Sequence, residues 1–252
     1  MSEIVQPVVA APVPTGPTMS VGARAIAVFI HPTRAWTGLT ERAQWWFPLL
    51  IILIVGCGGS ALLQERALVP MMSETWDEQV QSGRMTAQQV EKMEGFFSSP
   101  AGYAIIAGQN LIVTTLIVLL VGLVIWFGVG FVLGTGLRYR PALEVAAWAS
   151  LINVPAQIIA FAEAWALQTF KGVHVGFGAL LPPDSHAKLI VALRVFLDGI
   201  GPFSIWYLAV SVLGAAALSG APRKSVAWVL TSLYLLLTAC IAAISALFAP
   251  GS

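Results

Sequence analysis

The sequence predicts an all-α fold, a polytopic membrane protein built as a bundle of five transmembrane helices. Of its 252 residues, 58% are hydrophobic and only 10% are charged, whereas soluble domains carry about 25% charged residues. The run from Gly95 to Leu137 contains no Asp, Glu, Lys or Arg. It exceeds the roughly 20 residues with which a helix crosses a hydrocarbon core. It also lacks the short alternating pattern of transmembrane strands.

Five apolar segments are long enough to span a bilayer as helices. Together they define one membrane domain at residues 46–250, with an outer helical insert at residues 64–100. The predicted spans cover about residues 46–63, 103–133, 142–168, 200–219 and 226–248.

Two segments precede the first span. Residues 1–22 are rich in Pro, Ala and Val and predict a disordered tail without the basic start of a signal peptide. Residues 23–45 predict a cytoplasmic interfacial segment, in which TRAWTGLTER forms a short helix with Trp36 and Leu39 on one side. An ordinary lead-in to the first span is the alternative.

The insert at residues 64–100 is the most polar stretch and predicts two short helices that fold back onto the membrane domain. Thr86 and Gln89 have the spacing of a capping box and predict the start of the second helix. Its acidic residues indicate a solvated face rather than a cation site.

Small residues four apart predict places where two transmembrane helices approach closely. Such pairs occur in the first, second and third spans. The predicted helix-packing residues are Gly56, Ser60, Gly130, Gly134, Ala146 and Ser150.

The third span carries the pattern that could mean more than packing. Pro155 has no N–H and cannot bond the Leu151 carbonyl, so it predicts a kink. Asn153 and Gln157 flank it and could satisfy the freed backbone groups. One hypothesis is a small polar pocket that includes Trp206 and holds a lipid headgroup or a small solute. The other is a proline kink with no ligand.

Basic residues predict the orientation. Two short turns carry Arg138 and Arg140, and Arg223 and Lys224, without an acidic residue. The positive-inside rule places these turns in the cytoplasm. With five spans, the N-terminus is then cytoplasmic and the C-terminus extracytoplasmic.

Chargeable side chains are expected only near the membrane surfaces. Glu144 is expected to pair with Arg138 or Arg140 at the inner surface, and Glu163 and Asp198 to lie at the outer one. The three histidines fall outside the spans and lack HExxH spacing. We therefore predict no catalytic residue, no cofactor and no metal site, and a protein that is not an enzyme.

Three stretches resemble the Yip-domain family of five-helix integral membrane proteins, over about Pro32 to Phe248. They read HPTRAWTGLTERAQWWFPL, GTGLRYRPALEVAAWASLINVPAQII and LDGIGPFSIWYLAVSVLGAAALSGAPRKSVAWVL. The resemblance implies a five-helix bundle with a cytoplasmic N-terminus. Eukaryotic members work with Rab-type GTPases in vesicle traffic and membrane shaping.

This sequence lacks the long N-terminal region of eukaryotic members with its Asp-Leu-Tyr-Gly-Pro motif, which leaves GTPase binding in doubt. A prokaryotic-type member in the cytoplasmic (inner) membrane is therefore expected, with the Golgi or ER membrane as the alternative for a eukaryotic chain.

The predicted function is that of a non-enzymatic scaffold or adaptor that organises the membrane or recruits partners. The alternative is a channel or facilitator for a small neutral solute or lipid without proton coupling. The expected partners are the lipid bilayer and a membrane protein or a second copy of the chain. The net charge of +1 gives no attraction to nucleic acid.

Overall fold

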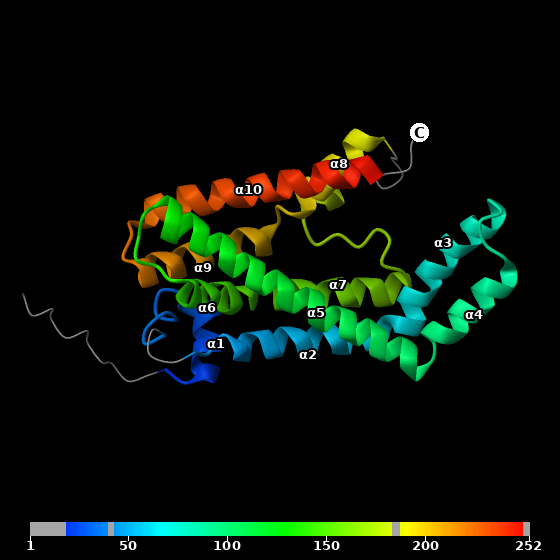
Figure 1. Cartoon of the computed structure of the whole chain (residues 1–252), viewed down its shortest axis with the longest axis horizontal. Coiled ribbons are helices and arrows are strands. Elements are labelled where there is room, and N and C mark those ends of the chain that lie inside the picture. Colours follow the sequence, from blue (N-terminus) through cyan, green and yellow to red (C-terminus); the bar gives the residue numbers. More distant parts are fainter. Residues whose placement is uncertain (1–18, 40–42, 183–186, 249–252) are drawn as a thin grey trace, which may run out of the picture.

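The computed structural model describes residues 19–39, 43–182 and 187–248, and the regular structure in these residues is helical. Five helices are long and apolar enough to cross a membrane, and they run along the long axis of the bundle (Figure 1). They confirm the predicted all-α membrane fold. These candidate spans are Trp46–Gln81, Pro100–Val132, Tyr139–Leu167, Pro202–Ser219 and Arg223–Phe248.

Some spans consist of more than one helical element. The elements, in chain order, are α1 (Val21–Ile30), α2 (Trp46–Leu63), the π-helix η1 (Gln64–Leu68), α3 (Val69–Gln81), α4 (Ala87–Phe97), α5 (Pro100–Ile125), the π-helix η2 (Trp126–Val132), α6 (Tyr139–Ser150), α7 (Asn153–Leu167), the 3₁₀-helix η3 (Phe177–Leu180), α8 (Lys188–Asp198), α9 (Pro202–Ser219) and α10 (Arg223–Phe248).

The first span continues into the polar insert without a break. The π turn η1 joins α2 to α3, and the Val69 N–H bonds the Gln64 carbonyl just before Pro70. Helix α4 begins with the predicted capping box of Thr86 and Gln89. The α3–α4 hairpin projects from the end of the bundle (Figure 1). The expectation that these helices fold back onto the membrane domain is wrong, because α3 leaves α2 at an angle and the hairpin points away from the bundle (Figure 1).

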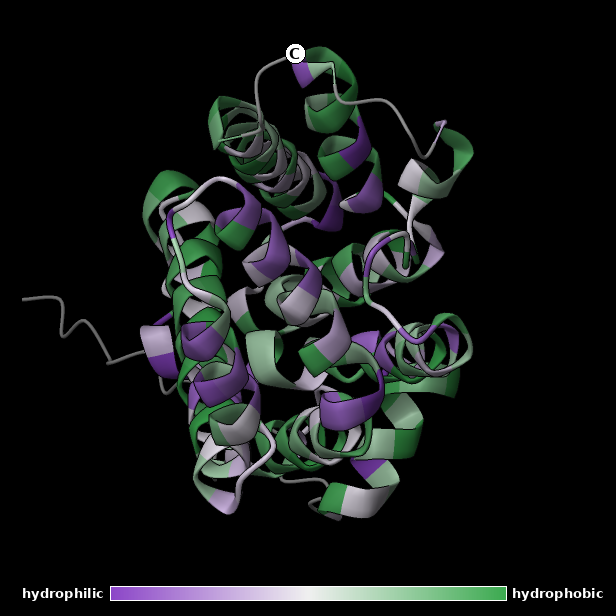
Figure 2. Ribbon diagram, turned by 90° about the vertical axis from the view of Figure 1, so that its right-hand side faces the viewer, coloured by the Kyte–Doolittle hydropathy of each residue, from purple (hydrophilic) through white to green (hydrophobic). Residues whose placement is uncertain are grey.

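Helix α6 is the centre of the bundle and is surrounded by α1, α2, α5 and α9. Every residue from Ala142 to Ala149 is buried. Small side chains let the neighbouring backbones come close: a Cβ added at Gly122 of α5 would lie 3.1 Å from the Leu143 Cα. The other helices turn large hydrophobic side chains outward. Figure 2, seen from the hairpin end, shows these helices as mainly hydrophobic.

The third span is broken next to Pro155. Helix α6 ends at Ser150, residues Leu151 and Ile152 form a turn, and α7 begins at Asn153. The Leu151 carbonyl accepts from the Val154 N–H at 3.0 Å, because Pro155 has no N–H to offer it. The proline therefore divides the span into two helices.

The N-terminal segment differs from the predicted interfacial helix. The helix in this region is α1, and His31–Leu39 follow it as turns, with Trp36 and Leu39 buried in the core. Gly38 has a φ of +72°, which no continuing helix could use. The sequence pattern thus predicts that Trp36 and Leu39 share a packed side, but it predicts a helix where the backbone forms turns. Residues 40–42 of the predicted helix, like the tail at 1–18, lie outside the described part.

Helices α5 and α10 lie together at one end and diverge toward the other (Figure 1). At the near end, a Cβ added at Gly128 of η2 would lie 2.8 Å from Leu233 of α10. At the far end α8 packs along α10. Leu189 and Leu193 of α8 are 79% and 42% exposed and do not pack into the bundle. Helix α8 instead presents Val195 toward the bundle.

Candidate functional site

A group of polar side chains, here called the Arg24 cluster, lies where α1 meets α6. It comprises Arg24, Gln44, Glu144 and Trp148. Arg24 donates to the Gln44 Oε1 at 3.0 Å, to the Thr37 carbonyl at 2.9 Å and to the Ala35 carbonyl. Glu144 accepts from the Gln44 N–H at 2.7 Å and from the Trp148 Nε1 at 3.2 Å. The Arg24 guanidinium also lies 5.7 Å from the centre of the Trp148 ring.

The position of Glu144 differs from the expected pairing at the membrane surface. Its side chain is buried and bonds Gln44 and Trp148, while Arg138 and Arg140 are exposed. Arg24 provides the buried positive charge near it. Burial lowers the pKa of the Arg24 guanidinium, and the Glu144 carboxylate opposes that shift. Glu144 still interacts electrostatically with Arg140, but its hydrogen bonds go to Gln44 and Trp148, because the N-terminal segment packs on this face of α6.

The Arg24 cluster holds the N-terminal segment against the bundle. Its bonds to the Ala35 and Thr37 carbonyls fix the turn that carries Trp36. The Trp36 ring then lies on Gly214 of α9, where an added Cβ would be 2.7 Å from it. The Arg24 cluster therefore anchors the N-terminal segment to the bundle, because its polar side chains bond other segments of the same chain.

A second polar site lies next to the break in the third span. A cavity of about 300 Å³ is lined there by Asn153, His174, Asp198 and Ser204, among others. The His174 Nδ1 lies 2.8 Å from the Asp198 Oδ2. Glycines at 176 and 178 pack directly on Asp198, so a side chain at either position would collide with it. The pair ties the chain after α7 to the end of α8.

The structure separates the four residues of the predicted polar pocket. Asn153 lines the cavity just described. The Gln157 amide instead faces Gly56 of α2, at 3.4 Å from where a Cβ would be. Trp206 packs edge-on against Phe29 of α1, with ring centres 5.9 Å apart. Trp206 is not among the residues that line the cavity next to Asn153. Pro155 acts through the backbone break.

Of the predicted helix-packing residues, some contact a neighbouring helix or segment and one does not. Ser60 accepts from the Asn110 Nδ2 of α5 at 2.7 Å, which joins the first two spans. Ala146 is buried in α6, and Ser150 donates to its carbonyl at 2.7 Å. Gly130 packs on the Leu137 carbonyl. Gly134 is not a packing residue: it has a φ of +64°, and nothing lies within 4 Å of an added Cβ. Its role is to end the π-helix η2.

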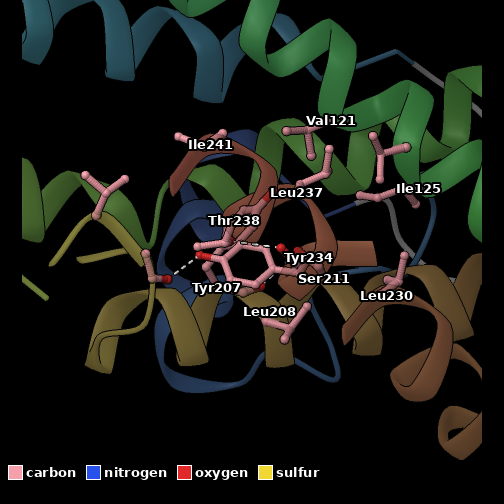
Figure 3. Close-up of a pocket in the computed structure, with 13 residues that line it drawn as sticks. Val121, Ile125, Tyr207, Leu208, Ser211, Leu230, Tyr234, Leu237, Thr238 and Ile241 are labelled. Carbon is pink, nitrogen blue, oxygen red and sulfur yellow. Dashed lines mark hydrogen bonds between the residues drawn. The ribbon is translucent and has the colours of Figure 1, made fainter. Parts of the chain in front are cut away.

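A larger cavity of about 310 Å³, the intramembrane pocket, lies between α5, α8, α9 and α10. Figure 3 shows its lining side chains converging from these helices. The lining is aliphatic apart from a few hydroxyl groups and contains no charged residue. Its lining residues are Val121, Val124, Ile125, Val195, Gly199, Tyr207, Leu208, Ser211, Leu230, Tyr234, Leu237, Thr238 and Ile241.

The hydroxyl groups of the intramembrane pocket already have partners. Tyr234 donates to the Gly199 carbonyl at 2.6 Å (Figure 3). Ser211 and Thr238 donate to backbone carbonyls of their own helices at 2.8 and 2.9 Å. The Tyr207 side chain is hydrogen-bonded with Ser211 and Ser150. The pocket therefore offers a mainly apolar surface to whatever enters it.

The described residues do not assemble the ligand set of a metal centre. Among the described residues, no group of three or more His, Cys, Asp and Glu could hold a metal ion. His174 turns to Asp198, while Asp184 and His186 lie outside the described residues. Glu163 is exposed on α7, as expected of a residue near a membrane surface.

Sequence reasoning missed the Arg24 cluster and the intramembrane pocket. Gln44 and Glu144 are far apart in the chain, and nothing in their spacing shows that they meet. The available signal for the cluster was a lone Glu inside the small-residue run of α6, where an acidic group needs a buried partner. The pocket had no such signal, since its lining reads as ordinary transmembrane sequence.

The comparisons with known proteins agree with this architecture. The family model described as the Yip1 domain matches residues 26–244. This match covers all five candidate spans up to Ile244, together with the second half of α1 and the turns that carry Trp36. Neither a curated protein nor a solved structure matches the chain significantly. The chain belongs to the Yip1 domain family of membrane proteins.

Proposed function

We propose that this protein is a non-enzymatic scaffold or adaptor of the membrane, which recruits partner proteins or organises lipid. The observation that carries the proposal is an apolar layer across the middle of the bundle. Leu151, Ile152 and Val210 are 2%, 0% and 1% exposed and belong to the main core. They lie between the Arg24 cluster on one side and the Asn153 cavity on the other.

This layer argues against the alternative function, a channel or facilitator. Passage of a neutral solute needs a continuous polar path. The Arg24 cluster beside α6 and the Asn153 cavity at the break of the third span would therefore have to connect. The Arg24 cluster uses its polar groups to hold the chain together. A conformational change that opens the layer would be required before the two sites could serve as a path.

The proposed orientation places the short turns after η2 and after α9 in the cytoplasm. The N-terminal segment then lies inside, and the α3–α4 hairpin and the end of α10 lie outside. Figure 1 supports the relation between these parts, because α1 and the hairpin lie at opposite ends of the bundle. Labelling of a cysteine at Gly83 in intact cells by a membrane-impermeant reagent tests this orientation.

Crosslinking in native membranes, followed by purification and mass spectrometry, tests the scaffold function. We expect a partner protein or a second copy in stoichiometric amount. In parallel, liposomes containing the purified protein should pass glycerol no faster than empty liposomes. The Ile152→Ser variant, which puts a small polar side chain into the apolar layer, serves as the control that an opened layer can be detected. Solute flux by the native protein without any stoichiometric partner would contradict the proposal.

A further inference from the structure

We propose that the intramembrane pocket holds one acyl chain of a bilayer phospholipid as a resident ligand. The proposal rests on the place of the pocket in the fold, on the chemistry of its lining and on its size. It is independent of the scaffold function, because a bound lipid chain is compatible with any partner.

The pocket is a wedge that opens sideways between two transmembrane helices. Helices α5 and α10 are close at η2, where Gly128 lets α10 approach, and they diverge beyond it (Figure 1). Helix α9 forms the floor, and Val195 and Gly199 close the far end. Leu237 and Ile241 line the pocket and are themselves exposed. The opening therefore lies on the outer surface of the bundle, where bilayer lipid surrounds the spans.

The lining favours hydrocarbon over a polar ligand. It contains no charged group, and its hydroxyls are hydrogen-bonded within the protein. A phosphate, an ammonium group or a sugar would lose its hydration there without gaining a free partner. An acyl chain loses nothing polar on entering and gains dispersion contacts on several sides.

The volume fits a substantial part of one acyl chain. An engineered apolar cavity of about 150 Å³ binds benzene. The intramembrane pocket, at about 310 Å³, therefore has room for roughly twice the six carbons of benzene. It also lies at the lower end of the range of about 300–1,000 Å³ typical of ligand pockets. Along α10 it extends from Leu230 to Ile241, or about 16 Å of helix.

Photo-crosslinking with a phosphatidylcholine that carries a diazirine in the middle of one acyl chain tests the proposal. The full-length protein is placed in nanodiscs that contain the probe, irradiated and digested, and the labelled residues are mapped by mass spectrometry. We expect labelling concentrated on the α5 and α10 residues that line the pocket. Even labelling of all lipid-facing residues would mean that only bulk lipid touches the protein, and would overturn the proposal.

Two variants fill the pocket from opposite walls, and each has a matched control. Val121→Trp on α5 and Leu237→Trp on α10 place an indole in the cavity. Leu120→Trp and Leu236→Trp place the same side chain on the neighbouring exposed position, outside the lining. We expect the pocket label to be lost in the first pair and kept in the second. Equal labelling in all four variants would refute an acyl-chain site.

A free fatty acid with the same diazirine distinguishes the source of the chain. Labelling by the phospholipid probe supports the proposal, and labelling by the fatty acid alone contradicts it. Equal thermal unfolding of the paired variants shows that loss of label reflects a filled pocket. If both filling variants unfold, lipid co-purified with the native protein is measured by native mass spectrometry instead. Absence of a phospholipid retained through delipidation would then count against the site.

Discussion

Replacement of Arg24 by Met should release the N-terminal segment from the bundle. The guanidinium makes three bonds, to the Ala35 and Thr37 carbonyls and to the Gln44 side chain. Hydrogen bonds to charged groups contribute about 1.5–3 kcal/mol each, and the burial of the guanidinium costs several kcal/mol. Because the change also removes a buried positive charge that interacts with the buried Glu144, we expect a net loss of about 3–5 kcal/mol.

Hydrogen–deuterium exchange in nanodiscs measures this loss locally. A destabilisation of about 3–5 kcal/mol corresponds to roughly 100- to 3,000-fold faster exchange, at tenfold for each 1.4 kcal/mol. We expect this acceleration in peptides that cover residues 31–39, and little change in α10. The Arg34→Met variant is the matched control, because Arg34 is exposed in the same segment. Unchanged exchange at residues 31–39 in the Arg24→Met protein would refute the anchoring role.

The double variant Arg24→Met/Glu144→Met isolates the electrostatic coupling of two buried charges that are linked through Gln44. Replacement of both buried charges by apolar side chains is often neutral, whereas loss of one leaves the other uncompensated. We therefore expect the double variant to exchange more slowly at residues 31–39 than the Arg24→Met protein. Additive effects of the two single changes would show that the charges act independently.

Three further variants test other parts of the structure. Pro155→Ala restores an N–H that can bond the Leu151 carbonyl, so the break should close and spin-label distances between the two ends of the third span should lengthen. Unchanged distances would mean that the proline does not cause the break. Glu163→Ala should change the unfolding free energy by no more than about 0.5 kcal/mol, because the carboxylate is exposed. Severe misfolding of the variant would show that Glu163 has a buried partner. Gly214→Val should lower the free energy of chemical unfolding by about 1–3 kcal/mol, because the Trp36 ring lies 2.7 Å from an added Cβ. An unchanged free energy of unfolding would show that the Trp36 ring can move aside.

The sequence predicts those features that depend on local chemistry. Apolar length alone identifies the five spans, because the requirement for a helix of about 20 residues is set by the bilayer and not by neighbouring segments. Thr86 and Gln89 predict the start of α4, since a capping box involves residues three apart.

Features that depend on contacts between distant segments could not be predicted in this way. Trp206 is predicted to lie with the polar residues around Pro155, but it packs against Phe29 of α1. Glu144 looked like a surface residue because it follows the basic turn, whereas α1 and Gln44 bury it. Neither contact leaves a periodicity in the chain. The intramembrane pocket likewise results from the divergence of α5 and α10, which their compositions do not encode.

The helical segment from Trp46 to Gln81 bends at the π turn η1, where α3 leaves the direction of α2 (Figure 1). Its 36 residues measure about 54 Å along the helix path, more than the roughly 30 Å of a hydrocarbon core. At its base, Gln44 joins Arg24 to Glu144, and farther along, Gln64 donates to the Phe97 carbonyl at 2.6 Å. Gln64, at the bend, is therefore the point at which a movement of the α3–α4 hairpin would reach the transmembrane helix α2.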